Sequence, residues 1–545
     1  MRAGPDSVAA QIARLLVARG IPRVFALCGG HIMPIWMALD AAGIQIVDVR
    51  DERAAVHMAQ AHAELTGELG VALVTAGPGL TNAITGIANA HVSRAPVLVL
   101  SGGSPRAQEN RGGLQDLDAT QLVRNITRYA RTVREATLVL PELDEAIARA
   151  FGESGEPGPV YIDFPVDTQR ADIPEVMQLE EHIRPKPRVV HEPDPAQVTA
   201  AVDLLWSGKR VLVISGRGAK GAGPELVALL DRLGAVYLDT GESRGLVPDT
   251  HPAVVGKMRG AVMGDADVVL TVGRRLDFQL AYGSPAVFGV AQFVRIGDTG
   301  GELRDNRRGS VEISATPRAA LRALVEAAGN RSSAVDKAWA AKLHASHEAR
   351  AAKLGDTLAN AAPGNDGKLH PNRVIGALGE AAGPDAIVIT DGGDFLAFAQ
   401  VGLNAPAMLD PGPFGCIGVG VPYGIAAALA FPGRPVLVAT GDDAFGFNAM
   451  EIDTAVRHGA KVLFVVANNG AWQIEVHDQT VTHGKVVGTR LQSADHAAVA
   501  RAFGLHAERV ERAEDLGPAI ARAMATEREV VANAALALLA DNAVN

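Results

Sequence analysis

The chain has 545 residues, 48% of them hydrophobic and 21% charged, so it is long enough for about three globular domains rather than one. Its formal net charge of −10 argues against nucleic acid or an anionic membrane surface as the main partner. Two cysteines exclude a disulfide framework and no apolar run reaches the ~20 residues of a membrane span, so we expect a cytoplasmic protein.

Residues 1–172 alternate between helical and strand patterns. The first 20 residues are amphipathic and include Asp6 and Arg14, which predicts a helix rather than a secretory signal. Short β-branched runs predict strands at 24–27, 44–48, 71–75, 97–100 and 160–164. Such alternation is typical of a doubly wound parallel sheet, and we expect an N-terminal α/β domain over 1–172.

Polar residues follow several of these predicted strands. His31 comes after the first strand, and Glu52 follows the second and opens a helix, where the helix dipole alone would also favour a carboxylate. The turn Gly77-Pro78-Gly79-Leu80-Thr81-Asn82 follows the third, and Gln115 lies in a later glycine-containing loop. Taken alone, a helix-start Glu is better explained by the dipole, and the case for these residues rests on the resemblance described below.

A second unit, 196–328, follows a linker rich in proline and charge at 173–195. Its first predicted strand, 210–215, runs into Gly216-Arg-Gly-Ala-Lys-Gly221, which matches G-x-G-x-x-G. After a strand this motif indicates a dinucleotide site, with Asp239 as the acid that would bind the ribose. A turn of small residues explains the glycines equally well, so an NAD-dependent oxidoreductase stays an alternative.

A third unit, 370–535, follows a charged helix and has predicted strands at 386–390, 436–440 and 462–466. Asp442 and Asn469 follow the last two strands, on either side of a predicted crossover helix at 450–457. A carboxylate and an amide oxygen suit Mg²⁺, and free N–H groups at a helix start suit phosphate. Asp and Asn also cap and turn chains very often, so the pair alone leaves both interpretations open.

The segment Gly441-Asp442-Asp443-Ala444-Phe445-Gly446-Phe447, followed by Asn468-Asn469, resembles the motif of the thiamine diphosphate (ThDP) enzyme family. The resemblance covers nearly the whole chain and looks most like the oxalyl-CoA decarboxylase and 2-hydroxyacyl-CoA lyase branch, which is itself similar to acetolactate synthase. It implies three doubly wound parallel-sheet domains, which are pyrimidine-binding, middle and diphosphate-binding. Asp443 departs from the family, which usually has Gly or Ser there.

The resemblance also implies roles for individual residues. Asp442, Asn469 and the backbone carbonyl of Ala471 would hold Mg²⁺, and Glu52 would donate a hydrogen bond to the pyrimidine ring. Glu475, Gln115 and His31 would face the substrate as catalytic candidates. The expected cofactor contacts are Pro78, Asn82, Gly393, Asp394, Ile417, Gly441, Asp443, Ala444 and Trp472. Ile417 would bend the cofactor, although an isoleucine is by default a core residue.

By resemblance the protein is an enzyme that makes or breaks a C–C bond beside a carbonyl. The substrate would be a 2-hydroxyacyl-CoA or a 2-oxo acid, and we favour the lyase or oxalyl-CoA decarboxylase activity over acetolactate synthase-like carboligation. The family also implies a homodimer or homotetramer with sites shared between subunits. ADP or FAD in the middle domain is disfavoured, because Glu156 stands where nucleotide-binding members carry Arg. A binding protein with an inactive site is the remaining alternative.

Overall fold

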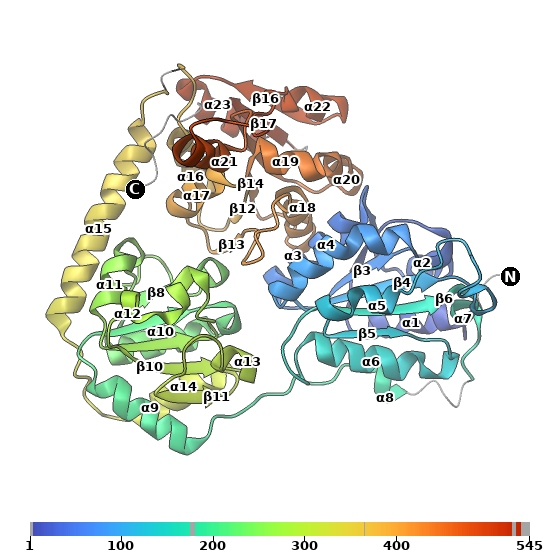
Figure 1. Cartoon of the computed structure of the whole chain (residues 1–545), viewed down its shortest axis with the longest axis horizontal. Coiled ribbons are helices and arrows are strands. Elements are labelled where there is room, and N and C mark those ends of the chain that lie inside the picture. The colour runs from blue at the N-terminus through green and yellow to red at the C-terminus, as the bar shows by residue number, and fades with distance from the viewer. Residues whose placement is uncertain (1–3, 175–179, 365, 526–529, 536–545) are drawn as a thin grey trace.

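The computed structural model describes residues 4–174, 180–364, 366–525 and 530–535, which form three α/β domains (Figure 1). A long helix, α15 (Lys337–Asn360), runs along the outside of the molecule from the central to the C-terminal domain (Figure 1). Each domain contains one sheet, and every pairing between its strands is parallel. The predicted fold class is therefore confirmed.

The N-terminal domain has a six-stranded sheet in the order β2-β1-β3-β4-β6-β5. Its strands are β1 (Arg23–Ala26), β2 (Gln45–Asp48), β3 (Gly70–Val74), β4 (Val97–Gly103), β5 (Tyr129–Thr132) and β6 (Val160–Pro165). Its helices are α1 (Val8–Ala18), α2 (Met33–Ala41), α3 (Glu52–Thr66), α4 (Pro78–Val92), α5 (Ala119–Val123), α6 (Val139–Ala150) and α7 (Val166–Arg170). The segment predicted as a linker contains a short helix, α8 (Glu180–Ile183), whose Ile183 joins the core of this domain.

The C-terminal domain repeats this arrangement, with the order β13-β12-β14-β15-β17-β16. Its strands are β12 (Ile387–Asp391), β13 (Ala407–Leu409), β14 (Val436–Gly441), β15 (Leu463–Asn468), β16 (His506–Val510) and β17 (Val530–Ala535). Its helices are α16 (Pro371–Ala382), α17 (Asp394–Gly402), α18 (Gly420–Ala430), α19 (Asp442–Asn448), α20 (Ile452–His458), α21 (Gln473–Asp478), α22 (His496–Ala502) and α23 (Ala513–Ala525). The two sheets thus share one topology, as the sequence predicts.

The central domain has a five-stranded sheet in the order β11-β10-β9-β7-β8. Its strands are β7 (Val211–Ser215), β8 (Val236–Leu238), β9 (Val268–Val272), β10 (Gln292–Gly297) and β11 (Val311–Ser314). Its helices are α9 (Pro195–Ser207), α10 (Gly223–Leu233), α11 (Arg259–Asp265), α12 (Pro285–Phe288), α13 (Gly300–Leu303) and α14 (Pro317–Ala328).

One hydrophobic cluster extends over the N-terminal and C-terminal domains, because helix α3 packs against helix α18. At this contact the ring of His57 lies edge-on to Tyr423, with the ring centres 6.1 Å apart. Asn89 of α4 donates a hydrogen bond of 3.0 Å to the Tyr423 hydroxyl. The two domains that carry the candidate site residues are therefore joined by a common core.

The crossover helix after β14 begins earlier than predicted. Helix α19 starts at Asp442 itself, and a 3₁₀ turn (Ala449–Glu451) separates it from α20. Gly441 is extended at the helix N-terminus, with φ −71° and ψ 157°. The carboxylates of Asp442 and Asp443 therefore lie in the first turn of a helix, which the N-terminal partial charge favours.

Gly70 allows α3 to approach β3 closely. A Cβ atom at this position would lie 1.9 Å from the carbonyl oxygen of Ala59, so the helix would have to move. We expect Gly70→Ala to lower the free energy of unfolding by about 1–3 kcal/mol or more, as overpacking does. Urea denaturation measures this loss. The matched control is Gly355→Ala, in exposed α15 with no atom within 4 Å, which should gain about 0.5–1 kcal/mol. A neutral Gly70→Ala would contradict this description of the packing.

Candidate active site

The first group of site residues lies at the start of α3. Glu52 is its first residue and only 5% exposed, and Asp51 caps the helix by accepting the N–H of Arg53 at 2.8 Å. Asn82 donates its side-chain N–H to Glu52 Oε2 at 3.0 Å. A Cβ atom on Gly79 would lie 3.1 Å from Glu52 Oε1. The turn at 77–82 and the acid are thus in contact.

His31 and Gln115 also meet, although 84 positions separate them in the sequence. The His31 Nδ1 atom lies 2.9 Å from Gln115 Oε1. Gln115 has a left-handed backbone, with φ +60°, which is strained for a non-glycine residue and typical of functional sites. A Cβ atom on Gly77, the residue before Pro78, would lie 2.9 Å from the Cβ of Gln115. Gln115 therefore packs against the turn at 77–82, which also contacts Glu52.

A cavity of about 540 Å³ opens next to Gly77 and Gln115, at the carboxyl ends of β4, β5 and β6. Three basic and four acidic side chains line it. The basic ones are Arg124, Arg131 and Arg134, and the acidic ones are Glu109, Asp116, Asp118 and Asp163. Asp163 is buried, and burial raises its pKa to about 6. The polar cavity therefore adjoins the residues that the sequence assigns to the substrate side.

The second group lies at the carboxyl ends of β14 and β15, which are paired directly. Asp442 accepts the backbone N–H groups of Asn469 and Gly470, at 3.3 and 3.2 Å. The Asn469 side-chain oxygen in turn accepts the N–H of Ala471 at 3.0 Å. These backbone and side-chain hydrogen bonds bring Asp442, Asn469 and Ala471 together at one edge of the sheet.

The electrostatics of this group suit a cation. Burial, together with the neighbouring carboxylate of Asp443, raises the pKa of Asp442 to about 6. Burial likewise raises the pKa of Asp394, at the start of α17. The described residues contain no cluster of three or more His, Cys, Asp or Glu side chains able to hold a metal, so any ion here would rely on amide and carbonyl oxygens as well.

The glycine loop at 392–393 leaves room beside these acids. Gly392 has φ +104°, and a Cβ on it would lie 3.1 Å from the N atom of Gly441. A Cβ on Gly393 would meet Ile474 of α21 at 3.0 Å. Side chains at either position would clash, so these glycines let the backbone of residues 392 and 393 approach Gly441 and α21 closely.

Asp443 occupies part of this space. Its Oδ1 atom accepts the N–H of Ala444 at 2.7 Å and would lie 2.2 Å from a Cβ on Gly441. Burial and the nearby Glu475 raise the pKa of this carboxyl. Asp443, the position at which this sequence departs from the family motif, thus accepts a hydrogen bond from an N–H group that could otherwise donate to a phosphate oxygen.

Ile417 lies on the loop before α18 and is only partly buried, so it is not a core residue. The next residue, Gly418, has φ +93°. Asp391, at the end of β12, accepts the N–H groups of Gly392, Gly418 and Gly420 at 2.7–3.2 Å. This buried carboxylate, which the sequence analysis missed although it ends a strand, holds the glycine loops at 392–393 and 418–420 together.

Trp472 and Glu475 flank the second group. Trp472 lies edge-on to Phe447, with the ring centres 6.2 Å apart, and forms the N-terminus of α21. Glu475 is exposed on the first turn of α21, near enough to Asp443 to affect its pKa. Among the described residues, no hydrogen bond or ion pair connects Glu52, His31 or Gln115 with this second group.

In the central domain, the glycines of the G-x-G-x-x-G segment have a packing role. A Cβ on Gly216 would lie 2.6 Å from the carbonyl oxygen of Gly273, and one on Gly218 would lie 2.8 Å from the Cα of Gly273. Arg217 is paired with Glu64 at 3.0 Å and Glu242 at 3.3 Å. The motif is thus used to pack two turns and to anchor α3.

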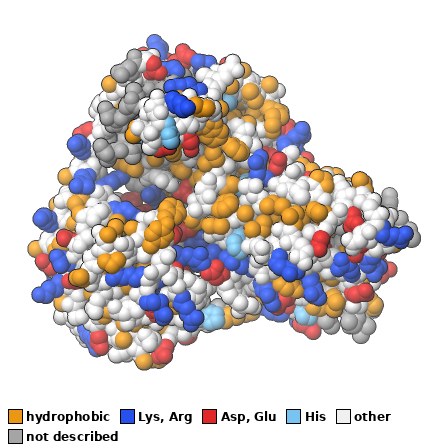
Figure 2. All heavy atoms as spheres, viewed as in Figure 1, with side chains coloured by type: hydrophobic (Ala, Val, Ile, Leu, Met, Phe, Trp, Pro, Cys, Tyr) orange, Lys and Arg blue, Asp and Glu red, His pale blue; other side chains and the backbone are white. Residues whose placement is uncertain are grey.

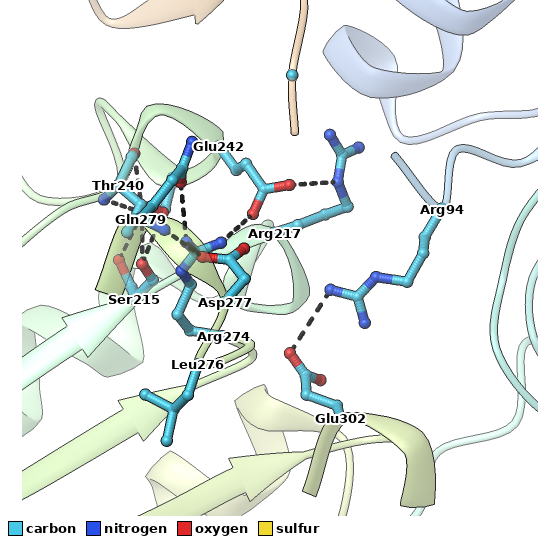
Figure 3. A network of polar contacts seen from close by, with 12 residues as sticks. Arg94, Ser215, Arg217, Thr240, Glu242, Arg274, Leu276, Asp277, Gln279 and Glu302 are labelled. Atoms are coloured by element: carbon cyan, nitrogen blue, oxygen red, sulfur yellow. Dashed lines mark hydrogen bonds and ion pairs between the residues drawn. The ribbon is translucent and has the colours of Figure 1, made fainter. Parts of the chain in front are cut away.

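Figure 3 shows a buried ionic network around this turn. Arg274 donates to Glu242 at 2.9 Å and to Asp277 at 2.8 Å. Arg94 of the N-terminal domain points towards Glu302 of the central domain, at 3.5 Å (Figure 3). Asp239, the predicted ribose-binding acid, is paired with Arg244 at 3.2 Å. Of these contacts, the Arg94–Glu302 pair joins the central domain to the N-terminal domain, and the others lie within the central domain.

Glu156 forms ion pairs with Arg128, at 3.1 Å, and with Arg275. Its Oε1 atom would lie 2.5 Å from a Cβ on Gly301, so the carboxylate lies against the start of α13. Both guanidinium groups that could pair with a phosphate here already have an internal partner. The structure thus adds a physical reason for the expectation drawn from Glu156.

The arrangement defines a class of protein: two α/β domains of the same topology, one offering a buried acid and the other a cluster of oxygen donors beside glycine loops. Family models for thiamine pyrophosphate enzymes match all three domains, as the N-terminal TPP-binding domain at 6–122, the central domain at 198–324 and the C-terminal TPP-binding domain at 391–534. The chain therefore belongs to the thiamine pyrophosphate, or ThDP, enzyme family.

Two kinds of curated relative are similar over most of this chain. The acetolactate synthase large subunit IlvG of Mycobacterium tuberculosis is 32% identical over 533 residues, covering 96% of this chain and 94% of the relative. The 2-hydroxyacyl-CoA lyase 2 of Caenorhabditis elegans is 31% identical over 547 residues, and that of Homo sapiens 32% over 549, each covering 92% of this chain and 84% of the relative. No helix among the described residues is long and apolar enough to cross a membrane.

Proposed function

We propose that the protein binds ThDP through Mg²⁺ and catalyses the cleavage or formation of a C–C bond next to a carbonyl. The observation that carries this proposal is the contact between Asp442 and the Asn469 backbone at the ends of adjacent strands. Asp442, Asn469 and the carbonyl of Ala471 would hold the ion, and the N–H groups of the glycine loops at Gly393 and Gly441 would receive the diphosphate. Asp394 and Ala444 flank that position.

When bound, ThDP supplies a nucleophilic carbon and an electron sink beside the substrate carbonyl. The residues of this chain orient it and move protons. Glu52 would share its proton with the pyrimidine ring, held in place by Asn82, while Pro78 packs the turn against that ring. Ile417 would keep the cofactor bent, and Trp472 would border it.

The residues proposed to face the substrate are polar, which favours a polar substrate. Gln115 and His31 hold one another at 2.9 Å beside the cavity that Arg124, Arg131 and Arg134 help to line. Guanidinium groups there could pair with a carboxylate or with phosphates. Glu475, on the opposite domain, is the further candidate for handling a proton on the substrate side.

We propose that the protein is a homodimer or a homotetramer, in which each active site is formed by two subunits. In support, the acid and the metal donors lie on different domains, and apolar side chains are exposed near both groups. Leu114 is 76% exposed, Leu117 48%, Phe447 43% and Ile474 49%. Figure 2 shows hydrophobic side chains gathered on the C-terminal domain and where it meets the N-terminal domain. A partner's surface would cover them.

Within this class we favour a 2-hydroxyacyl-CoA lyase or oxalyl-CoA decarboxylase-like reaction, and acetolactate synthase-like carboligation or decarboxylation of 2-oxo acids is the alternative. Both kinds of relative are similar to about the same degree, so a product assay has to decide. Purified protein with ThDP and Mg²⁺ is given a 2-hydroxyacyl-CoA or pyruvate. Formyl-CoA with an aldehyde or ketone supports the first activity, and acetolactate supports the second.

Calorimetry provides the control for this assay. An absence of binding heat with ThDP and Mg²⁺ would contradict the proposed function and favour a protein that keeps the fold with an inactive site. Hydride transfer to NAD would favour the oxidoreductase alternative. For the central domain we propose that ADP and FAD do not bind, because Arg128 and Arg275 are paired with Glu156; calorimetry with each nucleotide tests this directly.

A further inference from the structure

The loop that leads into Glu52 is held by a carboxylate from another domain. Glu451, in the 3₁₀ turn between α19 and α20, is 1% exposed. Its Oε1 atom accepts the backbone N–H of Arg50 and that of Asp51, each at 3.0 Å. Its Oε2 atom accepts the Thr454 hydroxyl at 2.6 Å. We call these contacts the Glu451 clamp.

The clamp acts on the backbone immediately before the acid. The N–H groups at the start of a helix have no partner within the helix, and an unpaired buried N–H is costly. The Asp51 side chain takes the N–H of Arg53, while Glu451 takes those of Arg50 and Asp51. The path of the chain into Glu52 is therefore fixed by the C-terminal domain.

The neighbouring residues strengthen the same connection. The Arg53 guanidinium donates to the Phe447 carbonyl at 3.0 Å and to Asn448 Oδ1 at 3.3 Å. Asn448 donates in turn to the carbonyl of Gly418 at 2.6 Å. Since Gly418 follows Ile417, the contacts run from the start of α3 to the loop that carries the proposed cofactor wedge.

We propose that Glu451 is a positioning residue, which sets the direction of the Glu52 carboxyl through the backbone of Arg50 and Asp51. This inference rests on the proposed function, because it assumes that Glu52 acts on the pyrimidine ring. Glu451 is not one of the residues proposed to contact the cofactor. A displacement of Glu52 by about 1 Å would slow the proton transfer that Glu52 promotes by about 100-fold.

The test compares Glu451→Ala with Glu451→Gln. Glutamine keeps an oxygen for the two backbone N–H groups, and its amide can donate to Thr454. The first readout, made without cofactor, is amide hydrogen exchange of the peptide 49–54, which should speed up in Glu451→Ala and stay near wild type in Glu451→Gln. The second is exchange of the C2 proton of bound ThDP, which should slow by about 10- to 100-fold in Glu451→Ala only.

Asp453→Ala is the matched control, since Asp453 also joins the two domains. Its carboxylate pairs with the exposed side chain of Arg50, at 3.6 Å, and with Arg457 of its own helix, at 2.8 Å, whereas Glu451 accepts backbone N–H groups. We expect both exchange rates and the ThDP affinity to stay near wild type in this variant. If Glu451→Ala and Asp453→Ala behave alike, or if Glu451→Ala exchanges the C2 proton at the wild-type rate, the proposal is overturned.

Two further outcomes stay informative. Should Glu451→Ala fail to fold, Thr454→Val removes the hydroxyl that donates to Glu451 at 2.6 Å and accepts from Arg457 at 3.2 Å. An unchanged C2 exchange rate in that variant overturns the proposal. If wild-type protein itself exchanges no C2 proton, the proposed function fails. The amide exchange of 49–54 then still shows whether Glu451 holds the loop, so the two failures are distinguishable.

Discussion

Glu52→Gln is expected to remove nearly all turnover, by about 10²- to 10⁴-fold, while ThDP remains bound. Glutamine has the shape of glutamate and can keep the contact with Asn82, which is 3.0 Å in the wild type. It has no acidic proton to share with the pyrimidine ring. Steady-state rates with the substrate found in the product assay, and calorimetric titration with ThDP, measure the two quantities separately.

The matched control is Glu64→Gln, at the other end of α3. Glu64 is also a buried carboxylate, with a side chain 6% exposed, but it pairs with Arg217 of the central domain at 3.0 Å. Its loss should lower stability rather than turnover, because it breaks a buried ion pair. Turnover by Glu52→Gln near the wild-type rate would rule out the proposed role of this acid.

Asp442→Ala is expected to weaken ThDP binding by at least about 100-fold, since loss of an outer contact alone costs a metal site 10- to 100-fold. Asp442 is the single carboxylate in the proposed donor set, so its loss removes the charge that balances the ion. Calorimetry at fixed Mg²⁺ measures the affinity. Removal of Mg²⁺ by a chelator from the wild-type protein should reproduce the loss.

The neighbouring acid provides the control. Asp443→Ser removes a carboxylate one residue away without removing a metal ligand, and it frees the N–H of Ala444 that Asp443 now occupies at 2.7 Å. We expect ThDP to bind up to about tenfold more tightly, because a like charge beside the diphosphate is lost. Equal losses in Asp442→Ala and Asp443→Ser would show that the site is elsewhere.

The sheet architecture could be predicted from sequence because the strands are β-branched runs bounded by glycine. The run predicted at 436–440 is the strand Val436–Gly441, and that at 71–75 is Gly70–Val74. The meeting of Asp442 and Asn469 followed from the rule that parallel strands end at one edge. What failed was the start of the crossover helix, because Asp442 and Asp443 read equally well as a turn.

Contacts between distant segments could not be predicted. His31 and Gln115 meet only because a strained loop folds back on the 77–82 turn. Glu451 lies about 400 positions from the loop it holds, and nothing in its local sequence indicates a partner in another domain. Asp391 follows a predicted strand, but its role could not be predicted, because its three N–H partners lie on two separate loops, 392–393 and 418–420.

Because α3 and α18 share one hydrophobic core, the sequences of the N-terminal and C-terminal domains must remain compatible with each other. A substitution at Tyr423 alters the contacts of His57 and Asn89, which lie more than 300 positions earlier in the sequence. The central domain has its own hydrophobic clusters and meets the rest through ion pairs and loops. Natural variation, or recombination in the laboratory, could thus exchange that middle part while the flanking pair is inherited as a unit.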